Sequence, residues 1–276
     1  MLRKKFSLGT IFVIAFGAVV LFIILMPYIW MLSLSFKRTA EIMRAPEKIF
    51  PERWTYANYV TVFTRAPFFY WFRNSIVVTV SLTLIVLFTS SITGFVFAKY
   101  KFPGRTVLFW IILSSMMVPF QTTMIPNFLI INAIGLYNTL LALIVPMMIS
   151  GFGIFLCRQF CENIPDSLWE AALIDGASDL SIYLRIMVPL LRPCLAALGI
   201  FTFLGSWNEF LQALIMLESV RNMTLPIALS YFTNGAHSVD IGACMAAAAL
   251  IMTPVTIVFL TFQKHFIKGA AISGLK

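Results

Sequence analysis

The chain has 276 residues, of which 60% are hydrophobic and only 11% are charged. A soluble globular domain has about 45–50% apolar and about 25% charged residues, so this composition excludes a soluble protein and predicts an integral membrane protein. The net charge of +9 would favour nucleic-acid binding in a soluble chain. In a membrane protein, Lys and Arg gather at the membrane surface and in cytoplasmic loops, so we expect no nucleic-acid partner.

Charge-poor stretches mark the membrane spans, because a charge near the bilayer centre costs at least about 2.5–3.5 kcal/mol and a crossing helix needs about 20 apolar residues. Residues 6–36, 74–98, 193–217 and 241–263 each form one such stretch. The stretch 106–157 has the length of two spans, and turn-formers and helix breakers lie at its middle: Pro119, Pro126, Asn127, Asn132, Gly135 and Asn138. The sequence therefore predicts an all-α integral membrane protein with six transmembrane helices in a single domain, residues 1–276.

An even number of spans places both termini on one side of the membrane. Basic residues at 3–5, 99–105 and 264–268 flank that side, which predicts a multi-pass protein of the cell membrane with both termini cytoplasmic. Residues 37–73 then form an extracytoplasmic loop, although they carry seven Lys or Arg and three Glu. Longer loops cross the membrane with less regard for charge, so this loop does not overturn the prediction.

Residues 158–193 form a cytoplasmic loop that holds five of the eleven acidic residues. A short helix is expected to begin near Pro165, with Ser167 and Glu170 at the spacing of a capping box. Gly176 stands where a residue with positive φ would end this helix, and Ser178 can cap a second helix that runs toward Pro189. Two short helices joined at a glycine indicate a docking site for a soluble partner.

The spacing within this loop resembles that of a known family. The E-A-A-x3-G-x9-I-x-L-P signature of permease subunits of binding-protein-dependent ABC importers matches, with Val188 in place of Leu. The chain from about Ala45 onward is most similar to the smaller permease subunit of maltose-type and multiple-sugar importers. Short stretches carry this likeness: residues 54–60, Asn74-Ser75, residues 102–105, residues 207–210, residues 266–269 and residues 274–276.

The resemblance implies an ABC importer permease fold in which the loop 158–193, called the signature loop below, is the ATPase-coupling loop. Its coupling residues would be Glu170, Ala171, Ala172, Asp175, Gly176, Ala177, Ile186 and Pro189. The implied partners are a homologous second permease subunit, two ATPase subunits, an extracytoplasmic solute-binding protein, a sugar substrate and membrane lipid. The chain lacks the G-x4-G-K-[ST] phosphate-binding motif, so we expect a non-catalytic subunit with no cofactor of its own, and ATP and Mg in the ATPase subunits.

Polar residues within the spans are candidates for a substrate path: Gln121, Asn127, Trp207, Asn208 and Glu209. An ionisable group in a span indicates a functional site, but Glu209 near a helix end could equally reach water or pair with the second permease. The amides could equally join helices through hydrogen bonds, which is the commoner role. Glu170 has an alternative role as the capping-box partner of Ser167.

Other readings of the sequence have weaker support. An ion-coupled secondary transporter is the main alternative, but it would typically show internal repeats and several intramembrane ionisable residues. An intramembrane hydrolase is improbable, because the H-E-x-x-H and G-x-S-x-G motifs are absent. Cys157 and Cys161 lie four residues apart without further nearby ligands, so we expect buried apolar packing and no metal site. Ser90 and Gly94 form a small-x3-small pair suited to close helix packing.

Overall fold

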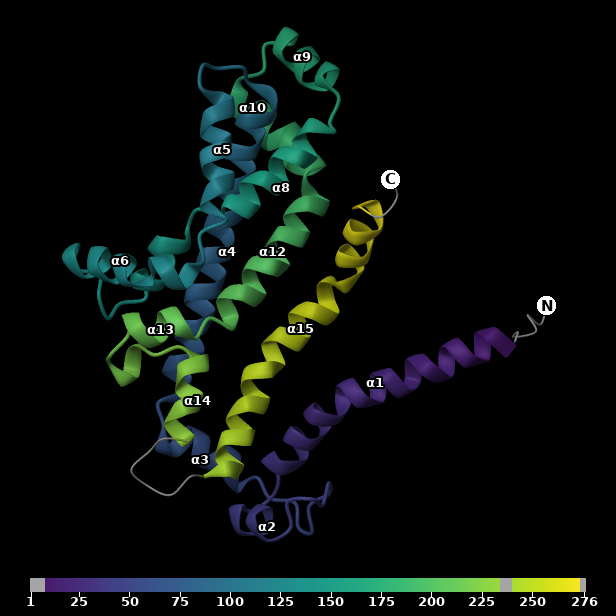
Figure 1. Ribbon diagram of the computed structural model, residues 1–276, viewed down its shortest axis with the longest axis vertical. Helices are drawn as coiled ribbons and strands as arrows, with labels where there is room; N and C mark the ends of the chain where they lie inside the picture. The colour runs from purple at the N-terminus through teal and green to yellow at the C-terminus, as the bar shows by residue number, and fades with distance from the viewer. Residues whose placement is uncertain (1–7, 234–239, 274–276) are drawn as a thin grey trace. The chain divides into compact units, whose positions relative to one another are not determined.

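The computed structural model describes residues 8–233 and 240–273, and these form helices without strands, as predicted (Figure 1). The predicted basic flank at residues 3–5 and the terminal residues 274–276 lie outside the described residues. The first helices are α1 (Leu8–Ser35), α2 (Thr39–Arg44), α3 (Ala57–Arg65) and α4 (Phe68–Lys99). The middle of the chain forms α5 (Arg105–Ser115), α6 (Phe120–Ala133), α7 (Leu141–Ile144), the 3-10 helix η1 (Val145–Met147) and α8 (Gly151–Glu162).

The remaining helices begin in the signature loop. They are α9 (Asp166–Ile174), α10 (Asp179–Ile182), the π-helix η2 (Tyr183–Met187), α11 (Val188–Leu190), α12 (Arg192–Trp207), α13 (Leu211–Met216), the 3-10 helix η3 (Val220–Asn222), α14 (Leu225–Thr233) and α15 (Ile241–Ser273). The chain divides into two compact units. Unit 1 contains residues 1–68 and 229–253, and unit 2 contains residues 69–228 and 254–276.

The predicted spans correspond to three continuous helices and three bent pairs. The continuous apolar stretches are Phe12–Ser35, Phe68–Lys99 and Ile241–Thr261. The pairs are α5 with α6, bent by 100°, Leu141–Met147 with α8, bent by 45°, and Asp179–Leu190 with α12, bent by 78°. Six spans result when each bent pair is one span.

The turn predicted at the middle of the stretch 106–157 lies at the C-terminal end of the predicted cluster, at Gly135 and Asn138. Pro119 is the N-cap of α6, and Pro126 lies inside that helix. Proline fits a helix start as well as a helix end, which explains why these residues do not form the turn. The turn comes after α6, where Gly135 has φ +74° and Asn138 has φ +58°. The side-chain oxygen of Asn138 accepts hydrogen bonds from the backbone amides of residues 218 and 219 at 3.0 and 2.9 Å.

In unit 1, the chain segment after α1 is held by the aromatic and amide side chains of residues 54–59. Phe36 has ring contacts with Trp54, Tyr56 and Tyr59, at centroid distances of 5.5, 5.7 and 5.2 Å. Asn58 is buried and donates two hydrogen bonds to the carbonyls of residues 35 and 37, at 2.8 and 2.6 Å. A Cβ at Gly242 would lie only 2.6 Å from Asn58 Oδ1, so a side chain at this position would displace the Asn58 amide. Residues 54–60 therefore hold the segment that follows the end of α1.

In unit 2, α4 and α8 pack so closely that glycine is found on one side of each of two contacts. A Cβ at Gly94 would lie 2.6 Å from Cys157 Cβ, and one at Gly153 would lie 2.3 Å from Ser90 Oγ. The predicted close packing through Ser90 and Gly94 is thus confirmed. Cys157 and Cys161 are fully buried in the core cluster of this unit, as expected.

Candidate functional site

The signature loop folds into two helices joined by a Schellman motif. Gly176 has φ +74°, which confirms the predicted left-handed residue. Its amide donates to Leu173 O, and the amide of Ala177 donates to Ala172 O, both at 3.0 Å. This pair of hydrogen bonds satisfies carbonyls that the end of α9 would otherwise leave unpaired. The bonds also explain the signature spacing, since Ala172 and Ala177 both pack in the core cluster of unit 2.

The start of α9 next to Pro165 was predicted, but the capping box was not found. The helix begins at Asp166, after Pro165 at the N-cap, which makes no side-chain capping bond. Ser167 therefore lies inside the first turn, and the capping box predicted for Ser167 and Glu170 is wrong. The sequence allowed several starts, and Pro165 with ψ 133° sets the actual one. Glu170 is exposed on the surface of α9.

The second helix of the loop begins as predicted. Ser178 is the N-cap of α10, and its Oγ accepts a hydrogen bond from the amide of Ser181 at 3.4 Å. The helix continues through the π-helix η2 into α11, where Pro189 lies in the first turn. Proline has no N–H to donate to the carbonyl four residues earlier, which fits a local change of helix type before it. Ile186 packs against the core cluster on this segment.

Two consecutive residues at the end of α4 bind the starts of both loop helices. Lys99 Nζ donates to Ile164 O at 2.6 Å and to Asp166 Oδ1 at 2.5 Å. Tyr100 Oη donates to Asp179 Oδ1 at 2.6 Å. Asp166 and Asp179 are the first residues of α9 and α10, which lie together at this end of α4 (Figure 1). We call this pair of residues the Lys99–Tyr100 clamp.

The clamp has distinct electrostatic effects on its two sides. The hydrogen bond from Lys99, followed by the lysine's positive charge, lowers the pKa of Asp166. Burial, followed by the hydrogen bond to the Asp179 carboxylate, raises the pKa of Tyr100 to about 12. The Tyr100 ring also contacts the Trp169 ring on α9 edge-on, with centroids 5.5 Å apart. Both loop helices are therefore fixed to α4 by polar and aromatic contacts.

The loop presents a partly apolar surface on the side away from the core. Ile174 is 87% exposed and Leu180 is 61% exposed. Glu170 and Ala171 are exposed beside them, whereas Ala172 is buried against the chain's own core. Of the three residues that open the signature, two face outward and one faces inward.

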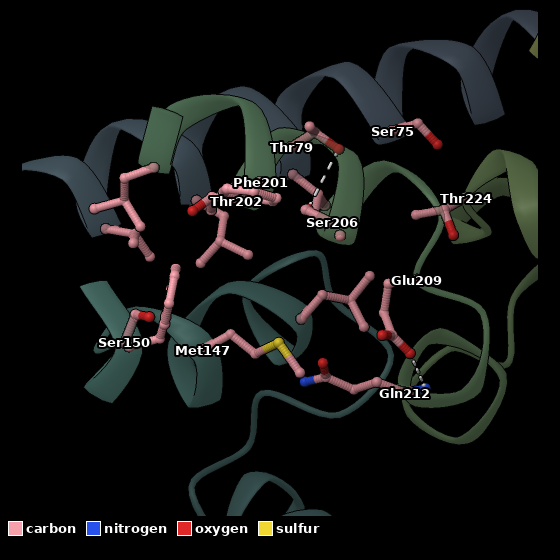
Figure 2. Close-up of a pocket in the computed structure, with 17 residues that line it drawn as sticks. Ser75, Thr79, Met147, Ser150, Phe201, Thr202, Ser206, Glu209, Gln212 and Thr224 are labelled. Carbon is pink, nitrogen blue, oxygen red and sulfur yellow. Dashed lines mark hydrogen bonds between the residues drawn. The ribbon is translucent and has the colours of Figure 1, made fainter. Parts of the chain in front are cut away.

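A pocket of about 310 Å³ lies in unit 2 (Figure 2). The residues of α4 that line it lie between Ser75 and Val86, away from Lys99 at the end of that helix. Its walls come from α4, α12, the segment from α7 to α8, and residues 209–224. The apolar lining residues include Met147, Leu198 and Phe201. The polar lining residues are Ser75, Thr79, Ser150, Thr202, Ser206, Glu209, Gln212 and Thr224.

Hydrogen bonds fix several of these polar side chains. Thr79 and Ser206 join α4 to α12 through their hydroxyls at 3.3 Å. Glu209 Oε1 accepts from the backbone amide of Gln212 at 2.8 Å, so it also caps the start of α13, as Figure 2 shows. Thr224 is 5% exposed, and its Oγ1 has no hydrogen-bond partner among the described residues.

Of the five predicted path residues, the pocket includes Glu209 alone. Trp207 is buried, with its ring stacked on Phe203 at 5.7 Å, and the Asn208 side chain donates to Leu204 O at 2.9 Å. Gln121 and Asn127 lie on α6 and do not line this pocket.

Sequence reasoning missed the hydroxyl residues of the pocket. Ser75 with Thr79, and Thr202 with Ser206, lie four residues apart and so share a helix face. This four-residue spacing was the signal in the sequence that could have identified these hydroxyl residues.

Known proteins are similar to this chain in both sequence and fold. The family described as binding-protein-dependent transport system inner membrane component matches residues 90–271. The chain belongs to this family. The permease resembles the arabinooligosaccharides transport system permease protein AraQ of Bacillus subtilis, with 34% identity over 99% of this chain and 98% of that protein. It also resembles the diacetylchitobiose uptake system permease protein NgcG of Streptomyces coelicolor, with 32% identity over 91% and 84% of the two chains.

A solved structure has the same fold as this permease. It is a bacterial ABC transporter involved in the import of the acidic polysaccharide alginate, with a TM-score of 0.83, 24% identity, and coverage of 96% of this chain and 100% of that chain. The family match spans the whole signature loop and the pocket walls from α7 onward. The resemblance stated from the sequence is thus confirmed.

Proposed function

We propose that this permease is the membrane subunit of a sugar ABC importer and forms half of the translocation pathway. The observation that carries the proposal is the signature loop, whose two helices are held at fixed angles by Gly176 and fixed to α4 by the clamp. A rigid loop with the exposed apolar residues Ile174 and Leu180 suits docking to a soluble subunit. The permeases of arabinooligosaccharide and diacetylchitobiose systems support a sugar as substrate.

The proposed assembly contains a homologous second permease subunit, two ATPase subunits and an extracytoplasmic solute-binding protein. A fold neighbour with a TM-score of 0.66 is an alginate ABC transporter in complex with a pentasaccharide-bound periplasmic protein, which supports the last of these partners. Both termini and the signature loop would be cytoplasmic. ATP and Mg would act in the ATPase subunits, and the permease itself would be non-catalytic.

In this mechanism, ATP-driven closure of the two ATPase subunits moves the signature loop. The clamp carries that movement to α4, because the starts of α9 and α10 are hydrogen-bonded to Lys99 and Tyr100. The attached spans then change from inward-open to outward-open. A ligand or partner shifts such an equilibrium only by its differential affinity for the two states, which the ATPase subunits supply through ATP binding.

Reconstitution tests the proposal. The complete complex in proteoliposomes should take up radiolabelled sugar from its solute-binding protein when ATP is inside. Uptake should stop when the ATPase subunits carry a substitution in their phosphate-binding lysine. An imposed proton or sodium gradient without ATP serves as the control. Uptake driven by that gradient, with inactive ATPase subunits, would instead support the ion-coupled transporter.

A further inference from the structure

A second cavity of unit 2, of about 460 Å³, lies where the end of α4 meets the start of α10, and we call it the α4-end cavity. Two charged residues line it, Lys101 and Asp179. A neighbouring cavity of about 280 Å³ shares Lys101 and adds Arg105. The apolar lining comes from α4 and from the signature loop and includes Ile92, Phe95, Val96, Leu180 and Tyr183.

The lining changes from apolar to charged at the place where the span of α4 ends. Ile92 and Val96 belong to the charge-free stretch 74–98, whereas Lys101 follows it. Ile92 lies about 10 Å before Lys99, the last residue of α4, along the helix axis. The α4-end cavity therefore extends from the depth of the hydrocarbon to the depth of the headgroups, and a phospholipid has the same change of polarity along its length.

Exposed apolar side chains on α4 lead into the α4-end cavity. Leu84 and Phe88 are exposed and lie four residues apart, and the same spacing continues through Ile92 to Val96, which is also exposed. Consecutive members of such a series are neighbours on the helix surface. An acyl chain that lies along these residues would therefore reach the cavity at Val96.

The charges of the two cavities are available to a headgroup. Lys101 and Arg105 form no ion pair with any described residue. Asp179 Oδ1 accepts from Tyr100 Oη, and Asp179 Oδ2 accepts no hydrogen bond from the described part of the chain. A headgroup that carries a phosphate and a primary ammonium matches this arrangement, because the phosphate can pair with the two cations and the ammonium can donate to the carboxylate.

Other headgroups match the lining less well. Phosphatidylglycerol has the phosphate but offers no cation to Asp179. Phosphatidylcholine has both charges, but its quaternary ammonium has no N–H to donate. A free phosphate would leave the apolar lining without a partner. Phosphatidylethanolamine alone among these supplies the phosphate, the ammonium donor and the acyl chains.

We propose that a phosphatidylethanolamine molecule binds in the α4-end cavity, with its phosphate at Lys101 and Arg105 and its ammonium at Asp179. The cavity volume of about 460 Å³ lies within the 300–1,000 Å³ typical of small-molecule sites, which fits the headgroup and the first part of one acyl chain. The lipid joins the end of α4 to α10, whereas no residue of α9 lines the cavity. This inference goes beyond the proposed function and does not depend on which solute is transported.

Lipid binding is measured by native mass spectrometry on the complete transporter, purified in detergent and delipidated. The probes are the dioleoyl forms of phosphatidylethanolamine, phosphatidylcholine and phosphatidylglycerol at equal concentration, and O-phosphoethanolamine is the competitor without acyl chains. Val96→Trp fills the cavity, so the lipid binding that it removes is the share of this site. Val80→Trp is the matched control, because Val80 is also exposed on α4, lines neither cavity, and lies about 24 Å from Val96 along the helix.

We expect this site to retain phosphatidylethanolamine at least about fivefold more than either other lipid, which is the effect of one exposed charged contact. Lys101→Gln should lower the binding of all three lipids and leave the ratio of phosphatidylethanolamine to phosphatidylcholine unchanged, because both lipids carry the phosphate. Asp179→Asn keeps an oxygen that can accept from Tyr100, and it should remove the preference for phosphatidylethanolamine over phosphatidylcholine. A loosened loop would lower the binding of both lipids equally, so this ratio separates a lost ammonium contact from a structural effect.

Three results overturn the proposal in the lipid assay. They are equal retention of phosphatidylethanolamine by Val96→Trp and Val80→Trp, equal binding of phosphatidylethanolamine and phosphatidylcholine by the wild type, and displacement of the lipid by O-phosphoethanolamine at equal concentration. The last result would indicate a site for a soluble phosphate compound. If Val96→Trp releases the ATPase subunits without changing lipid binding, the cavity belongs to the subunit interface, which also overturns the proposal.

Discussion

The Lys99–Tyr100 clamp predicts that Lys99→Met will loosen α9 while the rest of the chain stays folded. The Lys99 side chain is only 3% exposed, so its hydrogen bond to Ile164 O is shielded from water. A hydrogen bond to a charged group contributes about 1.5–3 kcal/mol. The ion pair with Asp166 adds little, because that carboxylate is 71% exposed and stays solvated when the lysine is removed. Methionine keeps the apolar stem of the lysine in place.

A loss of about 1.5–3 kcal/mol corresponds to about a ten- to hundredfold increase in local opening. Hydrogen exchange with mass spectrometry should therefore show faster exchange across Asp166–Ile174 in the assembled complex. Transport should fall relative to ATP hydrolysis, because movement of the loop reaches α4 less completely. Lys99→Arg, which can still donate to both oxygens, should restore part of the protection.

Lys101→Met is the matched control, since Lys101 is an exposed neighbour that also carries one positive charge. It should leave exchange across α9 near the wild-type rate. Unchanged exchange in Lys99→Met, or an equal increase in Lys101→Met, would refute the reasoning, because the effect would then come from net charge and not from the buried contact.

Three further predictions concern the signature loop. Gly176→Val should strain the backbone by about 1–3 kcal/mol and uncouple ATP hydrolysis from uptake in proteoliposomes. Gly176→Asn should cause a smaller loss of uptake, because asparagine tolerates positive φ. An equal loss of uptake in both variants would argue against a backbone cause. Ala172→Trp should destabilise the chain's own core and lower its thermal midpoint. The exposed Ala171→Trp should mainly reduce co-purification of the ATPase subunits. If the ATPase subunits co-purify normally with both variants, this surface is not part of the interface. The raised pKa means that the folded state favours protonated Tyr100, so its contribution to stability is complete below the unfolded pKa near 10 and is lost as the pH rises through about 12. Ultraviolet titration should show a late tyrosine transition that is smaller by one tyrosine in Tyr100→Phe and that begins at lower pH in Asp179→Asn.

Features set by short-range chemistry were accessible from the sequence. The charge-poor stretches predicted six spans, which the structure matches when each bent pair is one span, because charge in hydrocarbon is costly wherever the helix lies. Gly176 and Ser178 were predicted correctly, because a left-handed turn and an N-cap depend on residues close in the chain. The capping box of Ser167 and Glu170 was predicted wrongly, since Pro165 and Ser167 both fit a helix start and only the actual backbone distinguishes them.

Features set by contacts between residues that are distant in the chain could not be predicted from the sequence. Lys99 and Asp166 are 67 positions apart, and Tyr100 and Asp179 are 79 apart, so no local pattern pairs them. The pocket likewise gathers short hydroxyl side chains that are individually common in membrane helices. Charge drew attention to Glu209, and its neighbour Thr224 was missed because a single threonine carries no signal until its burial is known.

The helix α4 connects the two parts of the site. Ser75 and Thr79 line the pocket near its start, and Lys99 forms its last residue, about 30 Å further along the helix axis. No proline interrupts α4, in contrast to α1, α6 and α15, which contain Pro27, Pro126 and Pro254. A continuous helix that contacts the pocket at one end and the signature loop at the other gives both sites a shared element to act on. If α4 moves as one body, a ligand in the pocket and a partner bound to the signature loop bias the same equilibrium, and their effects on each other's binding must be equal.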